Sequence, residues 1–276
     1  MVNWNHWHTE PLLIGGILVT GWIYSLLVGP LRGLITGRQR FPIKEATYFS
    51  IGLASFYLAV GSPLDALSKE FLFSAHMLQH NVLMYVSSLF IVLGIPDWLV
   101  DTPARKSKSF RTVFRTLVNP VVAGFLFTLS FSIWHFPNLL EAALHSKPIQ
   151  SLEHMTLFLT SVLMWWSIAS RSKRFPPIQY GVQIIYFFLL MVAQTPVFGF
   201  LTFGKEVLYP TYVEVAHAFP YLPPIEDQML GGFIMKLANT LASLIVIGRA
   251  LYLWSKEPNN TAKLTRQQQS HRESKK

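Results

Sequence analysis

Seven long apolar runs divide this sequence from one end to the other. They cover residues 11–31, 43–60, 72–94, 113–135, 151–170, 179–203 and 229–254. Each is long enough to cross a bilayer as a helix, which takes about 20 residues. Across the chain, 51% of the residues are hydrophobic and only 13% are charged. We therefore predict an all-α fold, a polytopic bundle of seven transmembrane helices that occupies residues 1–256 and lies in the lipid bilayer.

The basic residues indicate which connections face the cytoplasm. A formal net charge of +9 would suggest nucleic-acid binding in a soluble protein. Here Lys and Arg gather after the first, third and fifth runs and towards the C-terminus, whereas the opposite connections hold only Lys69, Lys147 and Lys205. Short cytoplasmic loops carry such an excess. We predict an external N-terminus, an internal C-terminus and no nucleic-acid partner.

The ends of the chain and its cysteine content set further limits. With no cysteine, disulfides, thiolate metal ligands and thiol redox chemistry are excluded. No basic segment precedes the first apolar run, so we expect that run to remain as a helix rather than to be cleaved as a signal peptide. Residues 257–276 are polar and basic, which predicts a disordered cytoplasmic tail.

Four histidines lie within or at the ends of apolar runs, on the side predicted to be external. His76 and His80 are four residues apart, which places both rings on one helix face. His135 ends the fourth run and His154 begins the fifth, so the alternating span directions bring all four to a similar depth. Separate hydrogen bonds to neighbouring helices are the alternative explanation. Because intramembrane ionisable residues mark functional sites, we interpret the four as ligands of one metal ion.

Copper and zinc are the metals that this ligand chemistry allows. Imidazole binds both, and thioethers favour monovalent copper. Met77, Met229, Asp65, Glu153 and Asp227 are expected near the same membrane face, and we assign them a possible supporting role as extra ligands or as groups that orient the imidazoles. The other histidines expected on this side are interpreted as solvated, and they are His6, His8, His145 and His217.

Four other functions are conceivable for a seven-span chain with this histidine group. A zinc-protease helix requires Glu directly after the first His, and that position is Met77. A retinal Schiff base at Lys236 would need a carboxylate one turn earlier, where the chain has Gly232. Two alternatives stay open. One is a haem or redox protein with haem ligated by His80 and a histidine of another span. The other is a copper permease, which would need polar groups continuing inward.

Six short motifs occur in order between about position 60 and position 240. They are Ser62-Pro63-Leu64-Asp65, Ser74-Ala75-His76-Met77-Leu78-Gln79-His80, Trp134-His135-Phe136-Pro137, Glu141-Ala142-Ala143-Leu144, Leu152-Glu153-His154 with Trp165-Trp166, and Asp227-Gln228-Met229-Leu230-Gly231-Gly232. Together they resemble the caa3-type cytochrome c oxidase assembly factors, the CtaG family of Gram-positive bacteria. Asn81, where an apolar residue is commoner, and Lys236, where an aromatic residue is commoner, depart from the family pattern.

The resemblance implies a non-enzymatic, multi-pass protein of the bacterial plasma membrane that is needed to make an active respiratory caa3 oxidase. It also implies copper as the metal and an oxidase subunit as the partner. On this interpretation, copper would be held by His76, His80, His135 and His154 near the outer membrane face and passed to the oxidase.

Overall fold

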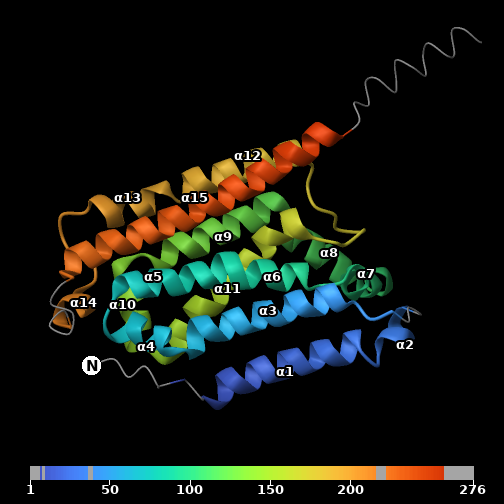
Figure 1. Ribbon diagram of the computed structural model, residues 1–276, viewed down its shortest axis with the longest axis horizontal. Helices are drawn as coiled ribbons and strands as arrows, with labels where there is room; N and C mark the ends of the chain where they lie inside the picture. Colours follow the sequence, from blue (N-terminus) through green and yellow to red (C-terminus); the bar gives the residue numbers. More distant parts are fainter. Residues whose placement is uncertain (1–6, 8–9, 37–39, 216–221, 258–276) are drawn as a thin grey trace, which may run out of the picture.

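The computed structural model describes residue 7 and residues 10–36, 40–215 and 222–257 (Figure 1). Every regular element in these ranges is helical, so the all-α prediction is confirmed for the part of the chain they cover. His6, His8, His217 and residues 258–276 of the predicted tail lie outside the described residues. In chain order the helices are α1 (Pro11–Val28), α2 (Arg32–Thr36), α3 (Ile43–Gly61), α4 (Pro63–Glu70), α5 (Phe73–Asn81), the π-helix η1 (Val82–Ser87), α6 (Ser88–Leu93), α7 (Asp97–Lys106), α8 (Lys108–Leu117), α9 (Pro120–Trp134), α10 (Pro137–His145), α11 (Lys147–Ala169), α12 (Tyr180–Ala193), α13 (Thr195–Phe203), α14 (Pro210–Glu214) and α15 (Pro224–Lys256).

Several of these helices are long and apolar enough to cross a membrane. Four qualify by length and composition, namely α1, the continuous helix Phe73–Leu93, the helix Tyr180–Phe203 and α15. Two bent pairs, α3 with α4 and α8 with α9, raise the number to six if each pair forms one span. The protein is therefore a helical membrane protein with several spans.

The fifth predicted span, residues 151–170, lies on α11. This helix has 23 residues, which is long enough to cross a bilayer, yet it is not among the helices that qualify. Its composition is the reason, because Glu153, His154 and several hydroxyl side chains interrupt its apolar sequence. Seven spans and their orientation thus remain predictions.

Proline and asparagine divide two of the predicted spans. The fourth span was expected over residues 113–135, but α9 begins at Pro120, after a bend of 59° from α8. The Asn119 side chain accepts a hydrogen bond from Val121 N–H and so caps the new helix. The sixth span breaks at Gln194, where Pro196 occupies the first turn of α13. Proline fits the first turn because the N–H it lacks would be unpaired there.

The short helices separate into two groups at opposite ends of the bundle (Figure 1). At one end lie α4, α10 and α14, and at the other lie α2, α7 and α8. Lys and Arg gather in the connections after the first, third and fifth predicted spans. These connections lie at the end of the bundle that holds α2, α7 and α8, which we call the basic end. In the connection between the fourth and fifth predicted spans the structure forms α10 and begins α11 at Lys147.

The helix Phe73–Leu93 runs through the interior of the bundle. It packs against α3, α4, α11 and α15. Where α6 crosses α3, a Cβ added at Gly94 would lie 2.6 Å from the backbone nitrogen of Phe49, so only glycine permits this approach. On the same helix, the side chains of Met77, Leu83 and Met84 are completely buried. The side chains on this helix are therefore held in place from several directions.

Candidate metal centre

Helix α5 places two imidazoles side by side in the interior of the bundle. His76 and His80 are four residues apart, so the repeat of 3.6 residues per turn puts them on one face. Their ring centroids lie 4.3 Å apart, and both side chains are fully buried. Two imidazoles this close together can bind the same metal ion.

A carboxylate from α15 fixes the start of α5. Phe73 N–H donates to Oδ2 of Asp227 over 2.6 Å, and Ser74 N–H donates to Oδ1 over 3.1 Å. A helix leaves its first N–H groups without backbone partners, and Leu72 at the N-cap position offers no side-chain acceptor. Asp227 therefore caps α5 from across the bundle and fixes the helix that carries His76.

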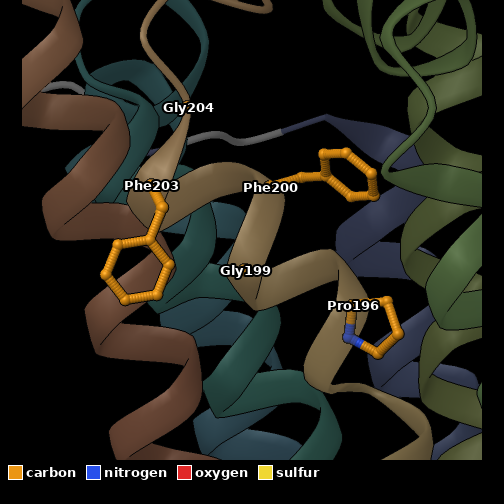
Figure 2. A pocket seen from close by; sticks show the side chains of 5 residues that line it. All are labelled: Pro196, Gly199, Phe200, Phe203 and Gly204. Atoms are coloured by element: carbon orange, nitrogen blue, oxygen red, sulfur yellow. The ribbon is translucent and has the colours of Figure 1, made fainter.

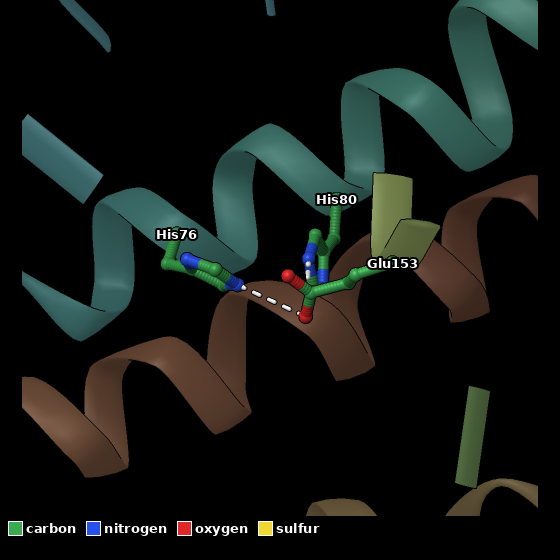
Figure 3. Close-up of side chains that lie close together, drawn as sticks. All are labelled: His76, His80 and Glu153. Carbon is green, nitrogen blue, oxygen red and sulfur yellow. Dashed lines mark hydrogen bonds and ion pairs between the residues drawn. The ribbon is translucent and has the colours of Figure 1, made fainter. Parts of the chain in front are cut away.

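Helix α11 brings a third ligand atom to the two imidazoles. Oε1 of Glu153 lies 3.4 Å from Nε2 of His76 and 3.3 Å from Nε2 of His80 (Figure 3). One ligand atom from each of the three residues lies within 4.8 Å of the others, and the three could together hold a metal ion. Sequence reasoning expected Glu153 in a supporting role. The structure places it between the two histidines, fully buried.

The two other candidate histidines border this group. The ring centroid of His80 lies 5.8 Å from that of His135 and 5.8 Å from that of His154. Nδ1 of His135 lies 2.6 Å from the carbonyl oxygen of Phe131, which makes Nδ1 the donor. In the neutral ring this leaves the Nε2 lone pair free, and that is the state a metal requires. The structure thus brings together all four histidines that the sequence analysis selected.

Atoms without a hydrogen-bond partner concentrate at this group. Of the thirteen buried side-chain nitrogen and oxygen atoms that lack a partner in the described residues, six belong to these five side chains. They are His76 Nδ1, both ring nitrogens of His80, Nε2 of His135, Nε2 of His154 and Oε2 of Glu153. A buried polar atom without a partner costs about 1–3 kcal/mol. Unpartnered imidazole nitrogens beside a buried carboxylate fit the donor set of a bound divalent cation.

Asp65 lies next to the site in a separate hydrogen-bond network. Its Oδ1 accepts from the amide of Gln79 over 2.8 Å and from that of Gln150 over 3.4 Å, and its Oδ2 lies 2.6 Å from Nζ of Lys69. Gln79 is on α5 between the two histidines and also donates to the carbonyl of Ala59 on α3. The network connects α4, α5 and α11 and so holds the histidine helix in register.

Of the two methionines considered as ligands, one packs against α15 and the other lies on the surface of α15. Met77 is fully buried against α15, where a Cβ on Gly231 would lie 3.1 Å from its Cγ. Met229 is 41% exposed on the surface of α15. Lys236 extends to α13, where Nζ lies 3.2 Å from the hydroxyl oxygen of Thr195. Met77 thus packs between helices, and the donors brought together are imidazole and carboxylate.

Sequence reasoning missed Tyr209 and Gln79. The Tyr209 hydroxyl donates to the carbonyl of His135 over 3.0 Å, and its ring stacks on Phe73. Burial raises the pKa of the Tyr209 phenol, which therefore remains a donor. Gln79 had a signal in the sequence, because it is a polar residue in the same apolar helix as the histidine pair. Tyr209 had none, since its position depends on how a long connection folds back.

A separate cavity of about 410 Å³ lies on the surface of α13 (Figure 2). It is lined by Pro196, Gly199, Phe200, Phe203 and Gly204. None of these side chains is ionisable, and Phe200 and Phe203 are largely exposed. This surface offers no ligand for a metal ion, so the histidine group is the candidate centre.

Comparison with known proteins places this chain in a family. No curated protein and no solved structure matches the chain. The model of the cytochrome c oxidase caa3 assembly factor family (Caa3_CtaG) matches residues 22–257, a range that includes all four histidines and Glu153. Because the match covers most of the chain, this protein belongs to the cytochrome c oxidase caa3 assembly factor family.

Proposed function

We propose that this protein holds a copper ion in the bundle and delivers it to a caa3-type cytochrome c oxidase during assembly. His76, His80 and Glu153 would bind the ion, with His135 and His154 as additional or exchanging ligands. The observation that carries the proposal is the convergence of three ligand atoms within 4.8 Å of one another, in a fully buried position. The protein would store and transfer the ion rather than catalyse a reaction.

The donor set favours copper among the metals of this ligand class. Affinity for divalent ions at nitrogen and oxygen sites generally rises to a maximum at copper. The chain has no cysteine, so thiolates do not contribute, and the three ligand atoms that converge are two imidazole nitrogens and a carboxylate oxygen. Imidazoles with one carboxylate suit divalent copper better than monovalent copper. An external position for this site follows from the predicted orientation, in which the basic end is cytoplasmic.

A metal titration tests the site directly. Purified protein in detergent, freed of metal, should bind one copper ion, and a His76→Ala, His80→Ala double variant should lose that binding. His145→Ala is the matched control, because the His145 side chain is 67% exposed on α10 and its ring nitrogen Nδ1 lies against Glu141 of the same helix. Equal stoichiometry and affinity in the wild type and the double variant would reject the site.

The role in assembly needs a cellular measurement. In a strain lacking the protein, the wild type and His145→Ala should restore caa3 oxidase activity and the copper content of the oxidase, and the double variant should not. Restored activity with the double variant would show that assembly of the oxidase does not depend on copper bound at this site.

Side-chain packing argues against the haem alternative. A porphyrin between His80 and His135 would need open space, whereas both residues are buried, with 0% and 7% of their surface exposed. Their helices also pack within one bundle interior whose side chains fill the space around them. The visible spectrum of the purified protein decides, since a Soret band would favour haem.

A further inference from the structure

A groove opens between three helices, away from the histidines and towards the basic end. Helix α15 packs along α5 but makes little contact with α6 and α11. The space left between them is a cavity of about 630 Å³. We call it the α6–α11–α15 groove, and its walls include Leu89, Leu93, Ile168, Ala238, Ala242 and Val246.

The groove walls are apolar along their length. Two aromatic residues, Tyr85 and Trp165, also line the groove, and their polar atoms are already hydrogen-bonded. The Tyr85 hydroxyl accepts a hydrogen bond from Asn239 over 3.0 Å, and the Trp165 indole N–H donates to the carbonyl of Met84 over 2.9 Å. The groove therefore offers hydrocarbon contact and little hydrogen bonding, as an acyl chain requires.

The length of the groove matches one leaflet of a bilayer. Its lining residues on α15 run from Ala238 to Arg249. At about 1.5 Å per residue, this segment spans roughly 16 Å. Half of a hydrocarbon core about 30 Å thick is roughly 15 Å. A chain lying in the groove would thus extend from the middle of the membrane to its surface.

Two arginines stand where the groove reaches that surface. Arg171 and Arg249 both line it. Arg171 forms an ion pair with Glu45, so its charge is largely neutralised. Arg249 is exposed on α15, and no ion pair to it is present among the residues that the structure describes. An anionic group at the mouth of the groove would meet this charge, and basic pockets between membrane helices bind anionic headgroups in this way.

We propose that the α6–α11–α15 groove binds one anionic phospholipid of the leaflet at the basic end. One acyl chain lies along Ala238 and Ala242, and the phosphate of the headgroup is held by Arg249 with Arg171 beside it. The lipid would fill the space between α15 and α6 that side chains leave open. This site is independent of the copper proposal, because its residues and the histidines are separate sets.

Lipid titration of the full-length protein tests this site. Delipidated protein in nonionic detergent is titrated with dioleoyl phosphatidylglycerol or dioleoyl phosphatidylcholine, and bound lipid is counted by native mass spectrometry. We expect one tightly bound phosphatidylglycerol. Arg249→Gln should weaken its binding about fivefold, since a basic residue near an anionic membrane surface contributes about 1 kcal/mol. Phosphatidylcholine binding should not change.

Matched variants distinguish binding in this groove from two other effects: the loss of any basic residue at this end, and the addition of a bulky residue anywhere on α15. Arg115→Gln removes an exposed basic residue of α8 at the same end and should have no effect. Ala242→Phe fills the groove and should weaken both lipids, whereas Leu241→Phe, on the exposed surface of α15, should weaken neither.

Three results would overturn the proposal. They are equal affinity for the two lipids in the wild type, an equal loss in Arg115→Gln and Arg249→Gln, and displacement of the long-chain lipid by inorganic phosphate or by dihexanoyl phosphatidylglycerol. The last result would identify a phosphate site that needs no acyl chain.

Discussion

Replacing Glu153 with glutamine should move stability and copper affinity in opposite directions. The carboxylate is fully buried, its Oε1 lies between the Nε2 atoms of His76 and His80, and its Oε2 has no hydrogen-bond partner in the described structure. Burying an ionised group costs several kcal/mol unless a partner compensates. Glutamine has the same shape and retains an oxygen that accepts from His76, but it carries no charge. We expect Glu153→Gln to stabilise the metal-free protein by about 1–3 kcal/mol.

Copper should act against this difference, because it stabilises the wild type more than the variant. Wild-type protein at a free copper concentration of 100 Kd gains about 2.7 kcal/mol from binding. The variant loses its only anionic ligand, and even groups that merely orient a ligand change affinity by about 10–100-fold. The Kd of Glu153→Gln should therefore rise at least tenfold, which is about 1.4 kcal/mol. At that copper concentration the variant gains at most about 1.4 kcal/mol from the metal.

Intrinsic fluorescence during a thermal scan gives the readout, because the chain contains eight tryptophans. Each kcal/mol should shift the apparent midpoint by roughly 2–4 °C in a protein of this size, with both proteins scanned at one rate. Asp101→Asn is the matched control for copper binding, since it makes the same chemical change at a buried carboxylate at the basic end, away from the histidines. If Glu153→Gln lowered the midpoint without metal and left copper affinity unchanged, Glu153 would be a structural partner of the histidines and the metal centre would lie elsewhere.

Three further substitutions test how the site is supported. Asp227→Asn should lower stability by about 2 kcal/mol and weaken copper binding, because the amide cannot accept from both N–H groups at the start of α5; unchanged thermal midpoint and affinity would contradict the capping role. Gly231→Ala should cost about 1–3 kcal/mol, since its Cβ would lie 2.5 Å from Cδ1 of Phe73, whereas Gly248→Ala, with nothing within 4 Å, should not lower the midpoint. Asp101→Ala should cost about 1–3 kcal/mol through lost bonds to the loop after α11, while copper titration should give an unchanged Kd because that loop is at the basic end.

The sequence predicted the histidine group because helical geometry is regular. Spacing of four put His76 and His80 on one face, and alternating span directions brought His135 and His154 to the same depth. Those two rules need only the length and order of the apolar runs. The rings are indeed neighbours, because the centroids of His80 and each of the other three rings, and those of His76 and His154, lie between 4.3 and 6.3 Å apart.

The roles of the carboxylates could not be predicted in the same way. Glu153 and His154 are adjacent, and neighbouring residues on a helix point about 100° apart, so the rotation of α11 decides which one faces α5. That rotation is set by packing against α9 and the helix Phe73–Leu93. Asp227 was expected beside the metal, but its acceptors are used by backbone N–H groups of α5, a contact that depends on where a distant helix begins.

The difficulty in counting spans and the location of the candidate site have the same cause. Helix α11 is long enough to cross the membrane, yet Glu153, His154 and the polar residues near them make it too polar to qualify by composition. These side chains can lie inside a bilayer only because other helices surround them, as the burial of Glu153, His154 and Gln150 shows. A polar group shielded by protein avoids most of the cost of contact with lipid. The predicted span that is hardest to recognise by composition is therefore the one that carries Glu153 into the candidate centre, and hydropathy alone is least informative where the candidate site is built.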